Sequence, residues 1–364
     1  MIVVYVILAL LMLGMMVLIH EAGHFWASRM TGIPVKEFGI GFGPKLTSKK
    51  SKKYDTLFVL RAIPAGGYCM YYGEDDPSSD QSDPRSLYRQ NVWKRMFAIV
   101  MGPMMNFISA FLVCVIFLLC LGRISYGEPD MTKPCVIISV DEGSPAAKAG
   151  LLPEDQILRI DGIDAVGYGT ESGYRTSELF SSYTGGEEGV AVTVMRNSEE
   201  ALLRVYPRLD PAEGVYRVGI SYAPQVKIEQ INSLGSLFQN SFRYMIDTGG
   251  TILKGLGSLF SNWNSFTSNA SGPIGIVSTV AEATRDYGIT AYVELLIIIS
   301  VNLGLFNLIP IPGLDGSRVV FLLVEAIRGK PVNQKIEAII HLCGYVLLFG
   351  LIILCSCQDV IRLF

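Results

Sequence analysis

Three residues near the N-terminus have the types and the spacing of a metal site. His20, Glu21 and His24 form the pattern HExxH, at the end of an apolar run that begins at Ile2. On a helix, two residues four apart lie on one face, about 5–6 Å apart at Cβ. The two imidazoles could therefore bind one ion, and the glutamate could reach a water molecule on it. We interpret the three residues as part of a zinc site that activates water.

HExxH on a helix is the arrangement of zinc proteases. The short pattern can occur by chance, but here it uses two of the three histidines in the chain. Polar groups at the end of an apolar helix are costly in a membrane and are usually functional. The alternative is a pair of interfacial histidines with a glutamate that extends to water.

Catalytic zinc needs a third protein ligand beside an open position. His341 begins the last apolar segment and is better interpreted as a packing or interfacial histidine. Glu294 lies toward the opposite end of the third apolar segment. Asp315 lies in NLIPIPGLDG, at the same expected depth as His20 and His24, and is the better candidate. The alternative is an aspartate that caps the next helix turn.

The segment around Asp315 is interrupted by prolines at 310 and 312 and by glycines at 313 and 316. Irregular backbone at membrane depth is tolerated only where it is buried in protein or lines a cavity. We therefore expect a broken helix that presents Asp315 as the second half of the site.

Four apolar segments are long enough to hold these residues inside a membrane. Half of the 364 residues are hydrophobic and only 17% are charged, against about 25% in a typical soluble domain. A helix needs about 20 apolar residues to cross the hydrocarbon core. The candidates are 2–24, 96–121, 291–327 and 338–361. We predict a polytopic α-helical membrane protein with four transmembrane helices.

Basic residues in short loops indicate how the spans are oriented. Lysines and arginines cluster between Arg29 and Arg61, and again between Arg328 and Lys335. Both loops are expected in the cytoplasm, with the HExxH end of the first span nearby and residues 122–287 outside. We predict a multi-pass protein of the inner or plasma membrane. The formal net charge of −3 gives no reason to expect a nucleic-acid partner.

Two stretches between the spans have the pattern of strands. Residues 35–72 alternate apolar with small or polar residues, which predicts a small membrane-associated antiparallel sheet. The later stretch GSPAAKAGLLPEDQILRIDG resembles a PDZ domain, with a short helix at 144–149 and a strand at 156–160. Glu154 stands where that family usually has glycine. PDZ domains bind an extended peptide at the edge of a sheet.

The predicted order places the two halves of the metal site on the first and third spans. The expected segments are a first transmembrane helix at 1–24, a cytoplasmic or membrane-associated β-hairpin region with a mobile loop at 25–94, a second span at 95–121, an inserted extracytoplasmic PDZ domain at 122–222, amphipathic surface helices at 223–288, a third span with the broken segment at 289–327, and a fourth span at 336–364.

These motifs, in this order, resemble the site-2 proteases, a family of zinc intramembrane proteases. The likeness rests on HEAGH in the first span, NLIPIPGLDG in the third and the PDZ-like domain between the second and third. GFGPKL, IPAGGYCMYYGE, GPMMNF and SGPIGI match further family segments. The chain looks most like the bacterial branch that cuts membrane-anchored anti-sigma factors. Well-known members of that branch carry two PDZ domains, and this chain has room for one.

The resemblance implies a zinc ion held by His20, His24 and Asp315, with Glu21 as the general base. The implied activity is the cleavage of transmembrane segments in single-span proteins within the bilayer. Substrates resembling anti-sigma factors, or remnant signal peptides, are expected. The PDZ-like domain could bind an extracytoplasmic peptide or exclude substrates with bulky outside domains, and the residues do not decide between these roles.

A substrate helix hides its peptide bonds in its own hydrogen bonds, so it must unwind before it is cut. An edge strand in the region 63–72, which contains Gly66, Gly67 and Tyr68, could pair with the freed backbone. This would hold the substrate extended beside the metal.

Intramembrane amides and the proline segment could bind the same unwound backbone. The resemblance supports Asn307, and with it Pro310 and Pro312 of the same motif. Asn106 and Asn302 are further candidates, for which helix–helix hydrogen bonding is the alternative.

Two other functions would use parts of the same sequence. A membrane adaptor would bind peptides through the PDZ-like domain, but it would not need Glu21 between two histidines spaced for a metal. A metal-ion transporter would need several sites along a path, and the chain has only three histidines. The protease therefore explains more of the sequence.

Overall fold

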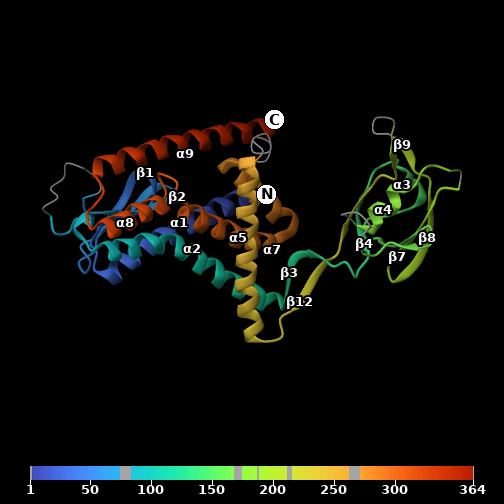
Figure 1. Ribbon diagram of the computed structural model, residues 1–364, viewed down its shortest axis with the longest axis horizontal. Coiled ribbons are helices and arrows are strands. Elements are labelled where there is room, and N and C mark those ends of the chain that lie inside the picture. The colour runs from blue at the N-terminus through green and yellow to red at the C-terminus, as the bar shows by residue number, and fades with distance from the viewer. Residues whose placement is uncertain are drawn as a thin grey trace. The chain divides into compact units, whose positions relative to one another are not determined.

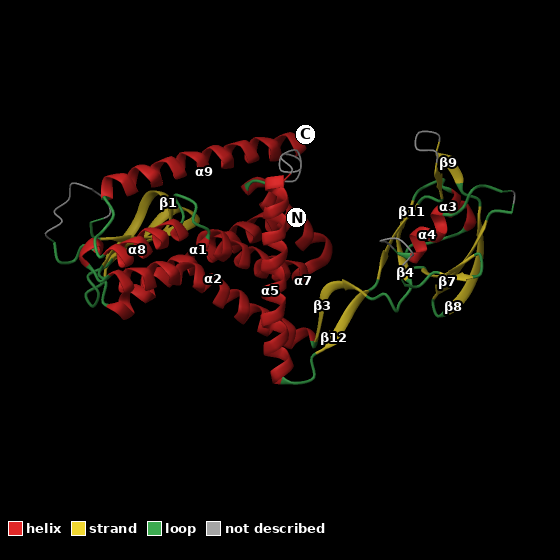
Figure 2. Ribbon diagram, in the orientation of Figure 1, coloured by secondary structure: helices red, strands yellow, loops and turns green. Residues whose placement is uncertain are grey.

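The computed structural model describes residues 2–73, 83–167, 174–186, 188–210, 215–261 and 271–363. The chain forms two compact units. The first combines Met1–Gly122 with Ile231–Phe364, and the second is Arg123–Gln230. The first unit is mostly helical and the second is mostly strands (Figure 2).

Six helices of at least 14 residues build the first unit. They are α1 (Ile2–Thr31), α2 (Val92–Leu121), α5 (Leu234–Ser261), α7 (Pro273–Leu308), α8 (Asp315–Arg328) and α9 (Gln334–Leu363). Within the described part of the chain, α1, α2, α7 and α9 are long and apolar enough to cross a membrane.

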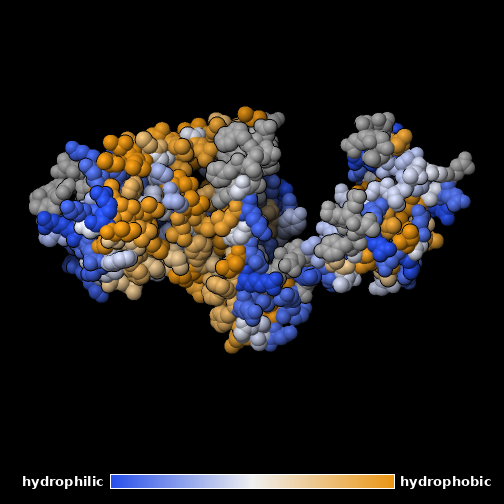
Figure 3. Space-filling model, viewed as in Figure 1, coloured by the Kyte–Doolittle hydropathy of each residue, from blue (hydrophilic) through white to orange (hydrophobic). Residues whose placement is uncertain are grey.

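The outer surface of these helices is apolar. Val346, Leu347 and Phe349 of α9 are each more than 60% exposed, and hydrophobic residues cover much of the visible face of this unit (Figure 3). Such surface is unfavourable in water and favourable against lipid chains. The first unit therefore has the surface of a multi-pass membrane protein.

α1, α2 and α7 pack against one another and form the centre of the first unit (Figure 1). Ala9, Met12 and Met16 of α1 are buried with Val280 of α7. Gly23 lets α1 approach α2 closely, because a Cβ there would lie 2.8 Å from Cγ of Met105. Small residues permit such close approach between membrane helices.

The first span is longer than the sequence suggested. α1 continues past residue 24 to Thr31, and Gly32 follows with φ +77. Glycine adopts this left-handed conformation without penalty, so it is a common helix terminator. His20 and His24 thus lie well inside the helix rather than at its end.

The expected third span at 289–327 is two helices. α7 begins earlier, at Pro273, bends at Gly288 and ends at Leu308, while α8 starts at Asp315. Pro310 and Pro312 have no backbone N–H, so they cannot continue the helical hydrogen bonds. The predicted break is present, and it separates the aspartate from the apolar helix before it.

β1 (Val35–Lys50) and β2 (Leu57–Tyr71) form an antiparallel sheet that folds back on itself. Ile40 pairs with both Gly67 and Leu60, so the first half of β1 lies between two parts of β2. The last part of β2, residues 67–71, is therefore an edge among the described strands. Most of the expected mobile loop, residues 74–82, lies outside the described residues. A short 3-10 helix, Leu87–Arg89, precedes α2.

The second unit is a small domain around one sheet. Its elements are β3 (Arg123–Pro129), β4 (Cys135–Val140), α3 (Pro145–Ala149), β5 (Gln156–Ile160), β6 (Ile163–Asp164), α4 (Arg175–Ser181), β7 (Val190–Arg196), β8 (Glu199–Val205), β9 (Arg208–Asp210), β10 (Val215–Arg217), β11 (Ile220–Pro224) and β12 (Val226–Gln230). The main sheet has the order β11-β4-β5-β7-β8, with β6 beside β5. Ile137, Ile157 and Val192 lie in its core.

The second unit ends later than expected. The segment expected to begin the surface helices at 223 first completes β11 and then forms β12, which pairs with β3. The chain thus enters this domain on β3 and leaves it on β12. The two strands pair, so each satisfies the backbone N–H and C=O groups of the other. The boundary lies at 230 rather than 222. In the described part of the expected surface-helix region, α5 and the first half of α7 follow it.

Candidate active site

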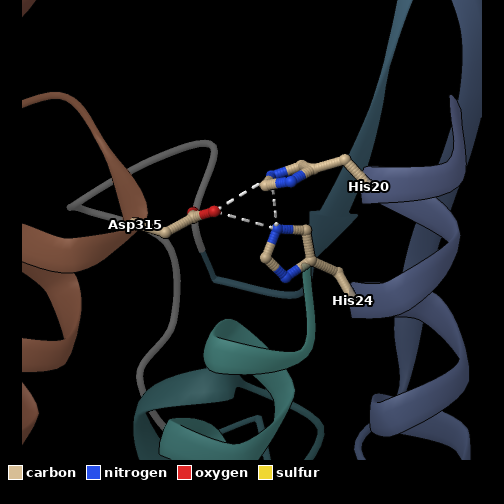
Figure 4. Close-up of side chains that lie close together, drawn as sticks. All are labelled: His20, His24 and Asp315. Carbon is tan, nitrogen blue, oxygen red and sulfur yellow. Dashed lines mark hydrogen bonds and ion pairs between the residues drawn. The ribbon is translucent and has the colours of Figure 1, made fainter. Parts of the chain in front are cut away.

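The structure brings together the two histidines of α1 and the aspartate at the start of α8 (Figure 4). His20 and His24 lie one turn apart, with 3.2 Å between their Nε2 atoms. Oδ2 of Asp315 lies 3.0 Å from Nε2 of His20 and 3.2 Å from Nε2 of His24. Nearly 300 residues of sequence separate the aspartate from the histidines, so the tertiary fold creates this cluster.

The cluster has the dimensions of a zinc site. Zinc–nitrogen bonds of about 2.0–2.1 Å at tetrahedral angles put neighbouring ligand atoms about 3.3 Å apart. The three separations of 3.0–3.2 Å are close to that value. Two imidazole nitrogens and one carboxylate oxygen are also the donor set of several catalytic zinc enzymes.

Hydrogen bonding favours a cation at the centre of the cluster. Nδ1–H of His24 donates to the carbonyl oxygen of Ala98 at 2.9 Å, so its Nε2 carries a lone pair when the ring is neutral. That lone pair faces Oδ2 of Asp315, a buried oxygen with no hydrogen-bond partner in the described part of the structure. Two acceptors 3.2 Å apart repel unless a positive charge lies between them. The residues present therefore fit zinc.

Asp315 reaches the histidines because it is the first residue of α8. The N-cap position is occupied by Leu314, which makes no side-chain cap hydrogen bond. The next residue, Gly316, packs against the end of α7, where a Cβ would overlap the carbonyls of Leu308 and Ile309. The carboxylate is directed toward α1, so the alternative of a capping aspartate does not describe its place.

Gly102 of α2 makes room for the ring of His24. A Cβ at this position would lie 2.9 Å from Cδ2 of the imidazole and nearer still to two other ring atoms. Ala98, one turn earlier, supplies the carbonyl that orients the same ring. Sequence reasoning noticed GPMMNF only as a matching segment and missed this contact.

Asn106 lies beside the other histidine, with its Nδ2 3.2 Å from Nδ1 of His20. Its Oδ1 is buried and has no partner among the described atoms. With the amide turned so that its oxygen faces His20, Nδ1–H of His20 donates to Oδ1 of Asn106. His20 then has the same tautomer as His24, with Nε2 free for the metal.

The expectation that Asn106 binds substrate needs correction. The residue has no exposed surface, and its backbone carbonyl accepts from the hydroxyls of Ser109 and Ser300 at 2.9 and 3.0 Å. A side chain enclosed by α1, α2 and α7 cannot contact a peptide in the site. We assign Asn106 to the orientation of His20.

Glu21 lines a cavity of about 250 Å³ together with His20, His24 and Asp315. The backbone of Cys69 hydrogen-bonds to its carboxylate. Gly67 lies alongside, since a Cβ there would be 3.4 Å from Cγ of Glu21. The edge of β2 therefore borders the glutamate directly.

The other predicted substrate-binding residues fall into three groups. Tyr68 and Asn307 line the same cavity as Glu21. Gly66 is buried with φ +114 against the ring of Phe42, while Pro310 is exposed and Pro312 is partly buried. Neither these two prolines nor Gly66 lines the cavity.

Asn302 lies in a different place. It lines a second, largely apolar cavity of about 460 Å³ between α1, α7 and α9. Its Oδ1 is buried without a hydrogen-bond partner in the described structure. It is not among the residues that line the cavity of Glu21.

Arg318, Tyr345 and His341 are neighbours of the site that sequence reasoning did not assign to it. Arg318 and Tyr345 line the cavity of Glu21. His341 is outside the cluster of possible ligands, and its Nδ1 accepts a hydrogen bond from N–H of Gly313. No local sequence pattern links α9 to Asp315, so these neighbours could be identified only from the tertiary structure.

The chain is similar to known proteins over nearly its full length. A protein of Fusobacterium nucleatum named "putative zinc metalloprotease" is 33% identical, and the match covers 98% of this chain and 99% of the relative. A protein of the same name from Nostoc sp. is 32% identical over 95% of this chain and 93% of the relative. The regulator of sigma E protease of Haemophilus influenzae is 29% identical, with 96% of this chain and 97% of the relative covered.

The model of one protein family, described as peptidase family M50, matches residues 8–351. The matched range begins before HExxH and ends beyond Asp315, so it contains all the elements that converge on the cluster. Members of this family are zinc-dependent site-2 proteases. Because the matched range includes both halves of the cluster, the chain belongs to peptidase family M50 and is a zinc metalloprotease.

Proposed function

We propose that this protease cleaves the transmembrane segments of single-span membrane proteins inside the bilayer. The observation that carries the proposal is the place of the cluster. His20, Glu21 and His24 belong to a helix that is long and apolar enough to cross a membrane, and α2 and α7 pack around it. A peptide bond that reaches Glu21 must therefore come from within or next to the membrane.

In this mechanism His20, His24 and Asp315 would hold the zinc ion. Bound zinc supplies a Lewis acid that polarises the scissile carbonyl and makes water acidic enough to lose a proton near neutral pH. Glu21 accepts that proton as the water oxygen bonds to the carbonyl carbon, and passes it to the leaving nitrogen as the C–N bond breaks. Asp315, as a ligand, is not available as the base.

The edge of β2 is the proposed docking strand for the unwound substrate. Residues 67–71 pair with β1 on one side only among the described strands, and Gly67 borders Glu21. A peptide added to this edge would satisfy its backbone groups in a ladder and pass the glutamate. Asn307, which also lines the cavity, would hydrogen-bond to the same peptide.

The apolar cavity at Asn302 is a further candidate surface for the substrate helix. Its lining comes mainly from apolar side chains of α1, α7 and α9, which suits a transmembrane segment. The unpartnered Oδ1 of Asn302 could accept from an N–H that unwinding releases. The two proline positions, Pro310 and Pro312, would contribute through the shape of the loop rather than by lining this cavity.

The second unit is proposed to be a PDZ domain outside the cytoplasm. The proposal is supported by α3 and β5, a short helix and a strand within the PDZ-like stretch of the sequence. β11 is an edge strand of its sheet, as peptide binding by strand addition requires. The hydroxyls of Tyr222 on β11 and Ser177 on α4 lie 2.7 Å apart, so a peptide between them would have to displace this contact. We favour the role of a size filter.

The proposed substrates resemble anti-sigma factors, with remnant signal peptides as a second class. The similarity to a relative named regulator of sigma E protease supports the first class. The proposed location is the inner or plasma membrane, with the HExxH end of α1 toward the cytoplasm, because the basic residues between 29 and 61 follow it.

The decisive experiment is Glu21→Gln in the full-length protein, reconstituted with a single-span substrate. Loss of the base should lower the cleavage rate by about 100-fold or more, while zinc content stays at the wild-type level. Glu282→Gln, on α7 and bonded to Ser278 rather than to the site, is the matched control. Cleavage by Glu21→Gln at the wild-type rate would exclude the proposed mechanism. A membrane adaptor or a metal-ion transporter would then be the better interpretation of the chain's function.

A further inference from the structure

His341 of α9 is tied to the loop that carries the aspartate. The residue is only 9% exposed. Its Nδ1 accepts a hydrogen bond of 3.1 Å from the backbone N–H of Gly313, two residues before Asp315. Since Nδ1 accepts, the neutral ring carries its proton on Nε2. The histidine therefore contacts the backbone of the loop rather than a metal ion.

The loop between α7 and α8 has few internal constraints of its own. N–H of Ile311 bonds to the carbonyl of Ile309, and N–H of Leu314 bonds to that of Ile311. Pro310 and Pro312 contribute no N–H. The hydrogen bond from Gly313 to His341 joins the loop to α9, a helix that does not flank it in the chain.

α9 also fits the loop by shape. Gly313 has φ +98, and a Cβ there would lie 3.2 Å from both Leu348 and Tyr345. On the facing side, a Cβ at Gly344 would lie 2.6 Å from Cβ of Pro312. The two glycines allow backbone to approach helix closely enough for the hydrogen bond at His341 to form.

We propose that His341 is a positioning residue for Asp315, so that the docking of α9 on the loop determines how tightly the site holds zinc. The inference rests on the proposed ligand role of Asp315. Accepting from Gly313 fixes the backbone just before α8, and the first residue of α8 then presents its carboxylate to His20 and His24. Such supporting contacts of a metal site commonly change metal affinity when they are removed.

A plain packing role is the alternative that the experiment must separate. The ring of His341 lies 5.7 Å from that of Phe321 and 6.5 Å from that of Tyr345, centre to centre. Aromatic neighbours at these distances stabilise a helix pair whatever the ring nitrogen does. His341→Phe keeps an aromatic ring but loses the acceptor, whereas His341→Asn loses the ring but places Oδ1 where Nδ1 was.

The test measures zinc affinity of the detergent-purified full-length protein by competition with a chelator, without substrate. We expect His341→Phe to bind zinc about three- to tenfold more weakly, the cost of one lost hydrogen bond, and His341→Asn to stay within about twofold of wild type. The visible spectrum of the Co²⁺-substituted protein should change in His341→Phe and not in His341→Asn. Thermal unfolding of the metal-free proteins reports packing separately.

A double-mutant cycle with Asp315→Ala shows whether His341 acts through the aspartate. In that background, His341→Phe should have no further effect on zinc affinity. Unchanged affinity in His341→Phe, or an equal loss in the phenylalanine and asparagine variants, would overturn the proposal. Zinc binding is measured without proteolysis, so a failure here is distinct from a failure of the proposed cleavage of membrane segments.

Discussion

At the scale of the residue, Gly102 decides how closely α2 can approach the ring of His24. The imidazole lies where the side chain of any other residue would begin. The same turn of α2 also provides the Ala98 carbonyl that sets the tautomer of His24. Because Gly102 has a hydrogen atom where alanine has a methyl group, the ring of His24 has room to direct its Nε2 at Asp315.

We predict that Gly102→Ala weakens zinc binding by about tenfold or more, because the added methyl group must displace the ring of His24. Gly250→Ala on α5 is the control, since a Cβ at Gly250 meets no atom within 4 Å. Zinc content after dialysis against a weak chelator measures the difference. Equal zinc retention in the two variants would contradict the assigned role of Gly102.

At the scale of the element, the helices that carry the ligands are held in place by buried polar contacts. Arg95 of α2 forms an ion pair with Glu325 of α8. At the far end of α9, Asp359 is 3% exposed and accepts from the backbone N–H groups of Gly272 and Gly275 at 3.1 and 2.8 Å. A carboxylate is favourable at this position, because the first turn of α7 has unsatisfied N–H groups and a positive dipole end.

Removing this carboxylate should destabilise the protein. We predict that Asp359→Ala lowers the free energy of unfolding by about 1–3 kcal/mol, the cost of leaving buried N–H groups unpaired. Thermal unfolding in detergent is the measurement. Asp286→Ala removes an exposed aspartate of α7 that pairs with its neighbour Arg285, and should change stability much less, because solvent screens an exposed ion pair. Equal losses of stability in the two variants would show that the contact of Asp359 with the start of α7 stabilises the protein no more than an exposed ion pair does.

At the scale of the whole molecule, the chemistry and the inserted domain belong to separate units. Every predicted site residue lies in the first unit. The chain leaves that unit at Gly122 and returns at Ile231, and N–H of Ile231 donates to the carbonyl of Gly122 at 3.0 Å. The two ends of the insertion are therefore already adjacent, so the domain can be removed without straining the helices.

We predict that replacing residues 123–230 by a short Gly/Ser linker leaves zinc content unchanged. A substrate with a bulky outside domain should then be cut faster, because the proposed filter is gone. Cleavage is compared for two substrates that share one transmembrane segment and differ only in the size of the outside domain. Loss of cleavage for both, with zinc retained, would instead indicate that the domain recruits substrate.

The sequence by itself determined the local chemistry and the class of fold. HExxH needs only helical spacing to place two imidazoles on one face, and four apolar runs are long enough to cross a bilayer. Prolines at 310 and 312, with glycines at 313 and 316 close by, predict a break in the helix. Such features depend on residues close together in the chain, so periodicity and composition are enough to predict them. The expected depth of the broken segment in the third span pointed to Asp315 as the third ligand.

Only the tertiary structure decided which distant groups meet. It brought Asp315 to within 3.0–3.2 Å of the two histidines, enclosed Asn106 against His20 rather than in the cavity, and set His341 on Gly313. It also carried the inserted unit on to residue 230. These outcomes depend on which helix faces pack and how closely glycines let backbones approach, and no local pattern in the chain encodes such contacts.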